Sequence, residues 1–159
     1  IHDRTGRLDQ AQDVLADGLG KNPGTQALTA RLGAVLIKAK KYAEAVAPLE
    51  EYVDGDPYNP QYFGYLGLAY LATGELKLAE KNLKKALEFD PDLVPAMNNL
   101  GYLYLSLYVK TADEKYYEMS THNFDAALDR EPGLPSAVKG KEAAVHQKAI
   151  MDDPGKKGT

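Results

Sequence analysis

The sequence predicts an all-α fold of repeated helical hairpins, and three observations lead to that prediction. The same apolar and small residues recur at intervals of 34 along the 159 residues. Within one interval, apolar residues fall at helical spacing in two separate runs. No window alternates apolar and polar residues over the length that a strand needs. One hairpin buries too little apolar surface to fold alone, so we expect successive hairpins to stack on a shared core.

Five columns of residues carry the period. The clearest is a leucine–glycine pair, which recurs at Leu32-Gly33, Leu66-Gly67 and Leu100-Gly101. Four further columns keep the same interval: Leu36, Tyr70 and Tyr104; Ala11, Ala45 and Ala79; Leu15, Leu49 and Leu83; Pro23, Pro57 and Pro91. Self-similarity at a fixed period of about 20 to 50 residues is typical of repeat architectures.

The copy that begins near residue 60 shows both helices of a hairpin. Its first run lies on one helical face, at i, i+3, i+4 and i+7: Phe63, Leu66, Gly67 and Tyr70. After the Thr73-Gly74 break, a second stripe follows: Ala79, Leu83 and Ala86. Asn59-Pro60 predicts the start of the hairpin and Asp90-Pro91 its end. We expect Gly67 to face Ala79, because small side chains let the two helices approach closely.

These positions resemble the tetratricopeptide repeat signature, with phenylalanine in place of the usual tryptophan. The matching residues are Phe63, Leu66, Gly67, Tyr70, Gly74, Ala79, Leu83, Ala86 and Pro91. Two departures occur in the preceding copy, where Lys40 replaces a glycine and Tyr52 stands in a normally small column. The resemblance implies a right-handed superhelical solenoid of antiparallel helix hairpins, whose first helices line a concave surface.

The repeat register predicts a single domain over residues 1–153. Its predicted parts are a partial repeat at 1–25, repeats at 26–59 and 60–93, an enlarged repeat at 94–134 and a capping helix at 135–153. Residues 154–159 are expected to form a flexible tail. The partner of a helix at 7–21 is mostly missing, so we expect upstream residues of a parent protein, or another copy, to cover its apolar face.

The enlarged repeat contains seven extra residues, which are expected to lengthen both of its helices. The Thr111–Glu114 segment fits a capping box and predicts a helix that starts near Ala112, after a helix at 95–109. Three tyrosines gather at this extended tip: Tyr108, Tyr116 and Tyr117. They either staple the two helices together or form an exposed aromatic surface for a partner, since tyrosine is enriched at interfaces.

Composition gives little support for catalysis or for nucleic-acid binding. The net charge of −4 lacks the basic excess that is usual for nucleic-acid binding, and the chain has no cysteine and three histidines. The glycine-rich stretch at 18–24 ends a helix instead of opening one, so it does not fit a phosphate-binding loop. We therefore predict no catalytic residue, no cofactor and no metal site.

No leader and no membrane-spanning segment is evident in the sequence, which predicts a soluble chain without membrane insertion. The residues do not indicate a cellular compartment.

The resemblance places a partner-binding groove on the first helices of the repeats. Its positions here are Ile37, Lys38, Gln61, Leu68, Leu71, Asn98, Tyr102 and Leu105. Some family members grip a chaperone's terminal carboxylate with two lysines, an asparagine and an arginine. Only Lys38 and Asn98 match those types, so we do not expect such docking. An apolar or amphipathic segment fits the groove better, although the same side chains could instead pack neighbouring first helices together.

The sequence thus predicts a non-catalytic scaffold that binds a peptide or helix of a partner protein. The alternatives are a regulatory or targeting arm of a larger enzyme, whose catalytic domain lies outside this fragment, and a module that self-associates through the uncovered N-terminal face.

Overall fold

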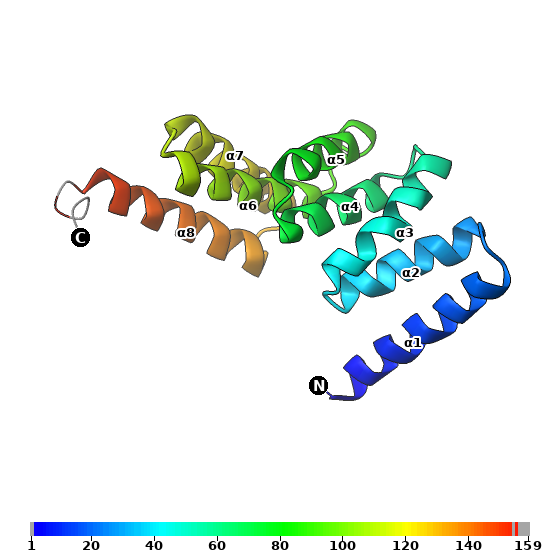
Figure 1. Cartoon of the computed structure of the whole chain (residues 1–159). Coiled ribbons are helices and arrows are strands. Elements are labelled where there is room, and N and C mark those ends of the chain that lie inside the picture. Colours follow the sequence, from blue (N-terminus) through cyan, green and yellow to red (C-terminus); the bar gives the residue numbers. More distant parts are fainter. Residues whose placement is uncertain (1, 154, 156–159) are drawn as a thin grey trace. The chain divides into compact units, whose positions relative to one another are not determined.

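The computed structural model describes residues 2–153 and 155, and over these residues it contains eight helices and no strand (Figure 1). The helices form two compact units, residues 1–91 and 92–159, which are described separately. The predicted tail at 154–159 lies outside the described residues, apart from Gly155. Among the described helices, none combines the length and apolar character needed to cross a bilayer. The prediction of one domain over 1–153 stays a prediction.

The first unit is a series of antiparallel helices, each packed against the next (Figure 1). Its elements are α1 (His2–Lys21), α2 (Gln26–Lys38), α3 (Tyr42–Gly55), α4 (Pro60–Thr73) and α5 (Leu76–Phe89). The first helices of consecutive hairpins, α2 and α4, also contact one another. By contrast, α3 and α5 both pack against α4 without contacting each other in the described part of the chain.

The leucine–glycine column holds the two helices of each hairpin together. A Cβ atom added at Gly33 would lie 2.5 Å from Leu49 Cδ2, and one added at Gly67 would lie 2.6 Å from Leu83 Cγ. Both leucines are completely buried. The sequence pattern paired Gly67 with Ala79, whereas the atoms nearest to a Cβ at position 67 belong to Leu83. A glycine on the first helix therefore receives a leucine from the second.

The turn between the helices of a hairpin requires a left-handed residue. Gly74 adopts φ 86° after α4, where glycine carries no steric penalty. Lys40 occupies the corresponding position one repeat earlier and adopts φ 60°. A side chain in this conformation costs about 1 kcal/mol. The departure from the signature at Lys40 is thus accommodated by local strain, without a change in the hairpin.

The second unit contains three helices that pack around one phenylalanine. They are α6 (Val94–Thr111), α7 (Glu114–Arg130) and α8 (Pro135–Asp152), and α8 packs against both α6 and α7. A Cβ atom at Gly101 on α6 would lie 2.6 Å from Phe124 Cδ1, and one at Gly140 on α8 would lie 2.3 Å from Phe124 Cζ. The completely buried Phe124 ring therefore fills the space beneath two glycines.

Four predicted helix boundaries, in three helices, differ from the structure. The first helix begins at His2 and not at residue 7, and α6 spans Val94–Thr111 in place of 95–109. The next helix begins at Glu114, because Ala112 is left-handed with φ 55° and ends α6. The capping residue is Asp113, whose Oδ1 accepts a hydrogen bond from the Lys115 N–H at 3.0 Å.

Removing this cap should weaken α7. Asp113→Ala is expected to lower the free energy of unfolding by about 1 kcal/mol, because it leaves a helix N–H without its acceptor. Thr111→Ala should cost less, since the exposed Thr111 hydroxyl donates to Leu107 O within α6 at 2.8 Å and accepts only a longer bond, at 3.3 Å, from the Asp113 N–H that precedes α7. Urea unfolding followed by circular dichroism measures both changes. A larger loss of stability for Thr111→Ala than for Asp113→Ala would contradict this assignment and support the capping box predicted from the sequence.

Candidate functional site

The predicted groove positions of the first unit lie on α2 and α4, which are in contact. Lys38 and Gln61 are exposed, and Leu68 and Leu71 are half-buried. Ile37 is 8% exposed and packs in the core, so it offers little surface to a partner. We call the four accessible residues, Lys38, Gln61, Leu68 and Leu71, the first-helix face.

Hydrogen bonding along α4 orients one end of this face. The Gln61 amide Nε2 donates to the Tyr65 hydroxyl at 2.7 Å. Gln61, Tyr65 and Leu68 follow i, i+4, i+7 spacing and therefore share one side of the helix. The side combines a polar end with an apolar middle, which suits an amphipathic partner.

The remaining predicted groove residues belong to the second unit and make internal contacts. The Tyr102 hydroxyl donates to Ser136 O at 2.6 Å, and the Tyr102 and Phe124 rings make a T-shaped contact with centroids 5.0 Å apart. Asn98 is buried, and its Oδ1 has no hydrogen-bond partner among the described residues. Leu105 is half-buried. Tyr102 thus connects α6 to α8. This contact agrees with the alternative that the predicted groove side chains pack helices together.

The tyrosines of the enlarged repeat also make internal contacts. Tyr108 is 0% exposed, which contradicts an exposed aromatic surface at this residue. Its ring lies 5.6 Å from that of Tyr117, and the Tyr104 and Tyr116 rings stack with centroids 6.3 Å apart. Each pair joins α6 to α7. These contacts support the stapling interpretation, while Tyr116 and Tyr117 stay half-buried.

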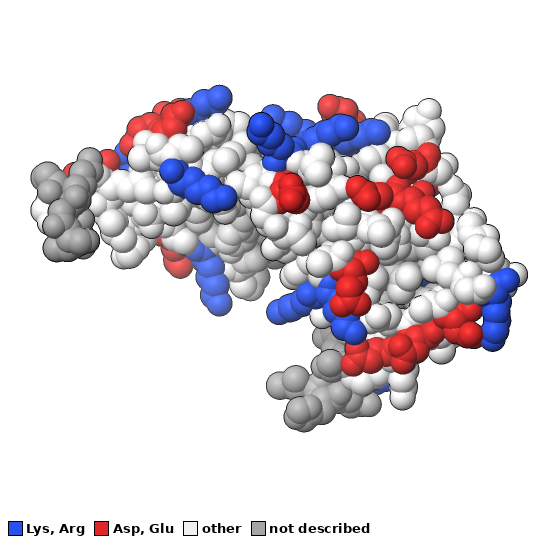
Figure 2. Space-filling model, viewed as in Figure 1, with Lys and Arg blue, Asp and Glu red and all other residues white. Residues whose placement is uncertain are grey.

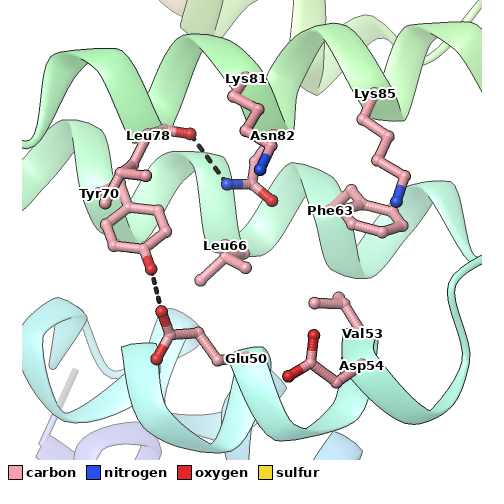
Figure 3. A pocket seen from close by; sticks show the side chains of 10 residues that line it. All are labelled: Glu50, Val53, Asp54, Phe63, Leu66, Tyr70, Leu78, Lys81, Asn82 and Lys85. Atoms are coloured by element: carbon pink, nitrogen blue, oxygen red, sulfur yellow. Dashed lines mark hydrogen bonds between the residues drawn. The ribbon is translucent and has the colours of Figure 1, made fainter.

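A cavity of about 400 Å³, which the sequence pattern did not predict, lies between α3 and α5 (Figure 3). The floor is apolar and includes Phe63 and Leu66 of α4. The α3 wall carries the carboxylates Glu50 and Asp54, and the α5 wall carries the ammonium groups of two lysines, Lys81 and Lys85. We call this the α3/α5 cavity.

A signal for the α3/α5 cavity is present in the sequence. Glu50 and Asp54 are four residues apart, as are Lys81 and Lys85, so each pair forms a stripe on its helix. From the sequence alone, such a lysine stripe is equally compatible with a solvated outer face of the helix. The sequence does not show that α3 and α5 both pack on α4 and leave a space between them.

The Tyr70 side chain fixes one carboxylate of the cavity. Its hydroxyl donates to Glu50 Oε1. Burial, reinforced by this contact with a carboxylate, raises the pKa of Tyr70 to about 12. Tyr70 therefore remains a neutral donor at physiological pH and holds Glu50 at the wall of the cavity.

Within the described residues, no cluster of three histidine, aspartate or glutamate side chains is arranged to hold a metal ion.

The second unit has an open apolar cavity of about 490 Å³ between α7 and α8, lined in part by Leu128, Val138 and Val145.

Family models match two stretches of the chain. The "TPR repeat" model matches residues 67–107, and the "Tetratricopeptide repeat" model matches residues 1–60. Human tetratricopeptide repeat protein 21A is 33% identical over 125 residues, which cover 76% of this chain and 9% of that protein. The chain spans 9%, 11% and 24% of the lengths of three curated relatives.

Solved structures share the fold at low sequence identity. A MamA protein superposes with a TM-score of 0.76 at 19% identity, covering 94% of this chain and 78% of that one. YrrB, described as a TPR protein with an unusual peptide-binding site, gives 0.68 at 19% identity and covers 92% and 72%. The first TPR of Spaghetti (RPAP3), bound to the HSP90 peptide SRMEEVD, gives 0.67 at 21% identity and covers 78% and 93%.

These matches agree with the helical hairpins, the 34-residue period and the glycine–leucine contacts. The predicted fold class, an all-α solenoid of antiparallel hairpins, is confirmed. The chain belongs to the tetratricopeptide repeat family.

Proposed function

We propose that the chain is a non-catalytic interaction scaffold whose first-helix face binds a peptide or helix of a partner protein. The observation that carries the proposal is that Leu68 and Leu71 keep exposed surface on α4. Lys38 and Gln61 add polar positions on the same pair of helices. Because packed helices hold these side chains, the scaffold loses little conformational entropy when a partner binds.

Two structural neighbours support a peptide as the partner. YrrB has a peptide-binding site, and the RPAP3 domain is bound to an HSP90 peptide. The same chaperone peptide is not the expected ligand here. Lys38 and Asn98 alone match the residue types of the carboxylate clamp, and Asn98 is buried. The peptide SRMEEVD therefore serves as a negative control.

The test is selection of a displayed peptide library on the full chain, followed by affinity measurement with the enriched peptides. We expect peptides with apolar residues at helical or alternating spacing. Leu68→Asp should weaken their binding at least about tenfold, because an unpaired carboxylate would face the apolar contact. The melting temperature should change little, since Leu68 is only half-buried.

The matched control is Val14→Asp, which introduces the same carboxylate on α1 at a side chain that is 71% exposed. It should leave peptide affinity unchanged. Equal losses for Val14→Asp and Leu68→Asp would argue against the first-helix face, as would enrichment of peptides whose binding Leu68→Asp leaves intact. Should Leu68→Asp unfold the chain, Leu68→Ser supplies a milder change at the same position.

A further inference from the structure

We propose that the α3/α5 cavity is a second docking site, separate from the first-helix face. Its ligand would be an extended peptide in which an apolar residue stands between an acidic and a basic residue. The inference rests on three features of the first unit: an apolar floor, two walls of opposite charge and an exposed aromatic pair beside the floor.

The floor is formed because α3 and α5 both pack on α4 and leave a gap between themselves. Phe63 and Leu66 of α4 form its base, and Val53 of α3 lines its side. All three side chains are buried, so the base is rigid. The volume of about 400 Å³ accommodates an aliphatic side chain together with neighbouring backbone.

Within the described residues of the first unit, the charges of the two walls take part in no ion pair. In the part of the chain that the structure describes, no ion pair joins Glu50 or Asp54 to Lys81 or Lys85. In Figure 3, the two lysines and the two carboxylates lie on opposite sides of the floor residues Phe63 and Leu66. Figure 2 shows basic side chains gathered over α5 and acidic ones over the end of α3. The opposite charges thus remain available to a ligand.

Two of these groups are already positioned. Lys85 Nζ lies 4.3 Å from the centroid of the Phe63 ring, a cation–π contact that places the ammonium group at the floor. On the opposite wall, the Tyr70 hydroxyl donates to Glu50. Both contacts reduce the side-chain entropy that would be lost on binding.

An aromatic pair extends the apolar floor to the surface. Phe89 stacks on Phe63 with centroids 6.0 Å apart, and Tyr58 meets the Phe89 ring at 5.9 Å. Phe89 is 40% exposed and Tyr58 is 75% exposed. Exposed aromatic side chains are enriched at the centres of protein interfaces. A peptide seated in the cavity would cover this pair with its next residues.

The charge pattern selects the ligand. A peptide in the polyproline II conformation has three residues per turn, so consecutive side chains point about 120° apart. An acidic–apolar–basic triplet could then place its apolar side chain on the floor and one charge at each wall. A ligand with only acidic residues would meet repulsion from α3, and one with only basic residues would meet repulsion from α5.

The test compares three fluorescein-labelled peptides that differ in a central triplet flanked by prolines: Glu-Leu-Lys, Lys-Leu-Lys and Glu-Leu-Glu. Fluorescence anisotropy with the full chain at low salt should give the highest affinity for Glu-Leu-Lys, by about tenfold. The double variant Lys81→Glu, Lys85→Glu has two acidic walls and should instead prefer Lys-Leu-Lys.

The matched control is Lys77→Glu, Lys84→Glu. It makes the same change in net charge on the same helix, with neither residue lining the cavity, and it should keep the preference for Glu-Leu-Lys. Circular dichroism confirms that each variant is folded. A preference for Lys-Leu-Lys in both double variants would mean that net charge decides, and would overturn the proposal.

The proposal for the α3/α5 cavity would also be overturned if the unmodified chain gave no anisotropy change with the Glu-Leu-Lys peptide at a concentration of about 1 mM. Leu68→Asp separates the two proposals, because it alters the first-helix face alone and should leave binding of the Glu-Leu-Lys peptide unchanged. Loss of this binding in Leu68→Asp would contradict a separate second site.

Discussion

Phe124→Ala is expected to lower the free energy of unfolding by about 3 to 5 kcal/mol, one of the two largest effects of a single substitution that we expect. The ring is completely buried, lies against the Gly101 and Gly140 backbones and makes a T-shaped contact with the Tyr102 ring. Alanine would leave a cavity at the junction of all three helices of the second unit. Urea unfolding monitored by circular dichroism measures the loss.

Phe124→Leu provides the matched control, since it keeps much of the buried volume and should cost clearly less. The alanine variant should also lose near-ultraviolet signal from the neighbouring Tyr102. Similar losses for the two variants would show that the cavity is filled by rearrangement, and that Phe124 does not join α6, α7 and α8.

Gly67→Val is the second substitution with a large expected effect, a loss of about 2 to 3 kcal/mol. Its Cβ would lie 2.6 Å from Leu83 Cγ and 3.2 Å from the Leu83 backbone nitrogen. The Leu83 side chain could adopt another rotamer, but the Leu83 backbone could move away only if α5 separated from α4. Thermal and urea unfolding report the change.

Gly20→Val is the control for Gly67→Val. Gly20 is also helical, yet a Cβ there meets no atom within 4 Å. Valine has a slightly higher helix propensity than glycine, so this variant should be neutral or more stable by a few tenths of a kcal/mol. If both substitutions had the same effect, close approach of α4 and α5 at Gly67 would be refuted.

The hairpins could be predicted from the sequence because each repeats a local pattern with one physical cause. Gly33 and Gly67 each precede their contacting leucine, Leu49 or Leu83, by 16 residues. Gly101 precedes Phe124 by 23, so the seven extra residues lengthen the hairpin and retain the contact. The sequence pattern placed Ala79 on the face opposite Gly67, and the atoms nearest to a Cβ at position 67 belong to Leu83, which lies on the same buried stripe of α5.

The helix start at Glu114 was not predicted, because two nearby residues, Thr111 and Asp113, could each have capped the helix. Thr111 fits a capping box, but its hydroxyl donates to Leu107 O inside α6. Asp113 then supplies the cap. The left-handed Ala112 between them could not be predicted, because alanine has no preference for that conformation.

The candidate sites depended on contacts between distant residues. Tyr102 donates to Ser136 O, 34 residues away, which changes an expected groove residue into a link between helices. Ile37 belongs to the same predicted groove and is buried. The α3/α5 cavity requires a gap between two helices that share α4 as a neighbour. A stripe of charges on one helix cannot reveal such a gap.

Backbone amide chemical-shift mapping with a peptide selected on the full chain tests partner binding by the first-helix face most directly. We expect the largest changes around Lys38, Gln61, Leu68 and Leu71, and we expect them to disappear in Leu68→Asp. Changes confined to residues away from α2 and α4, or a pattern that Leu68→Asp leaves intact, would contradict binding at this face.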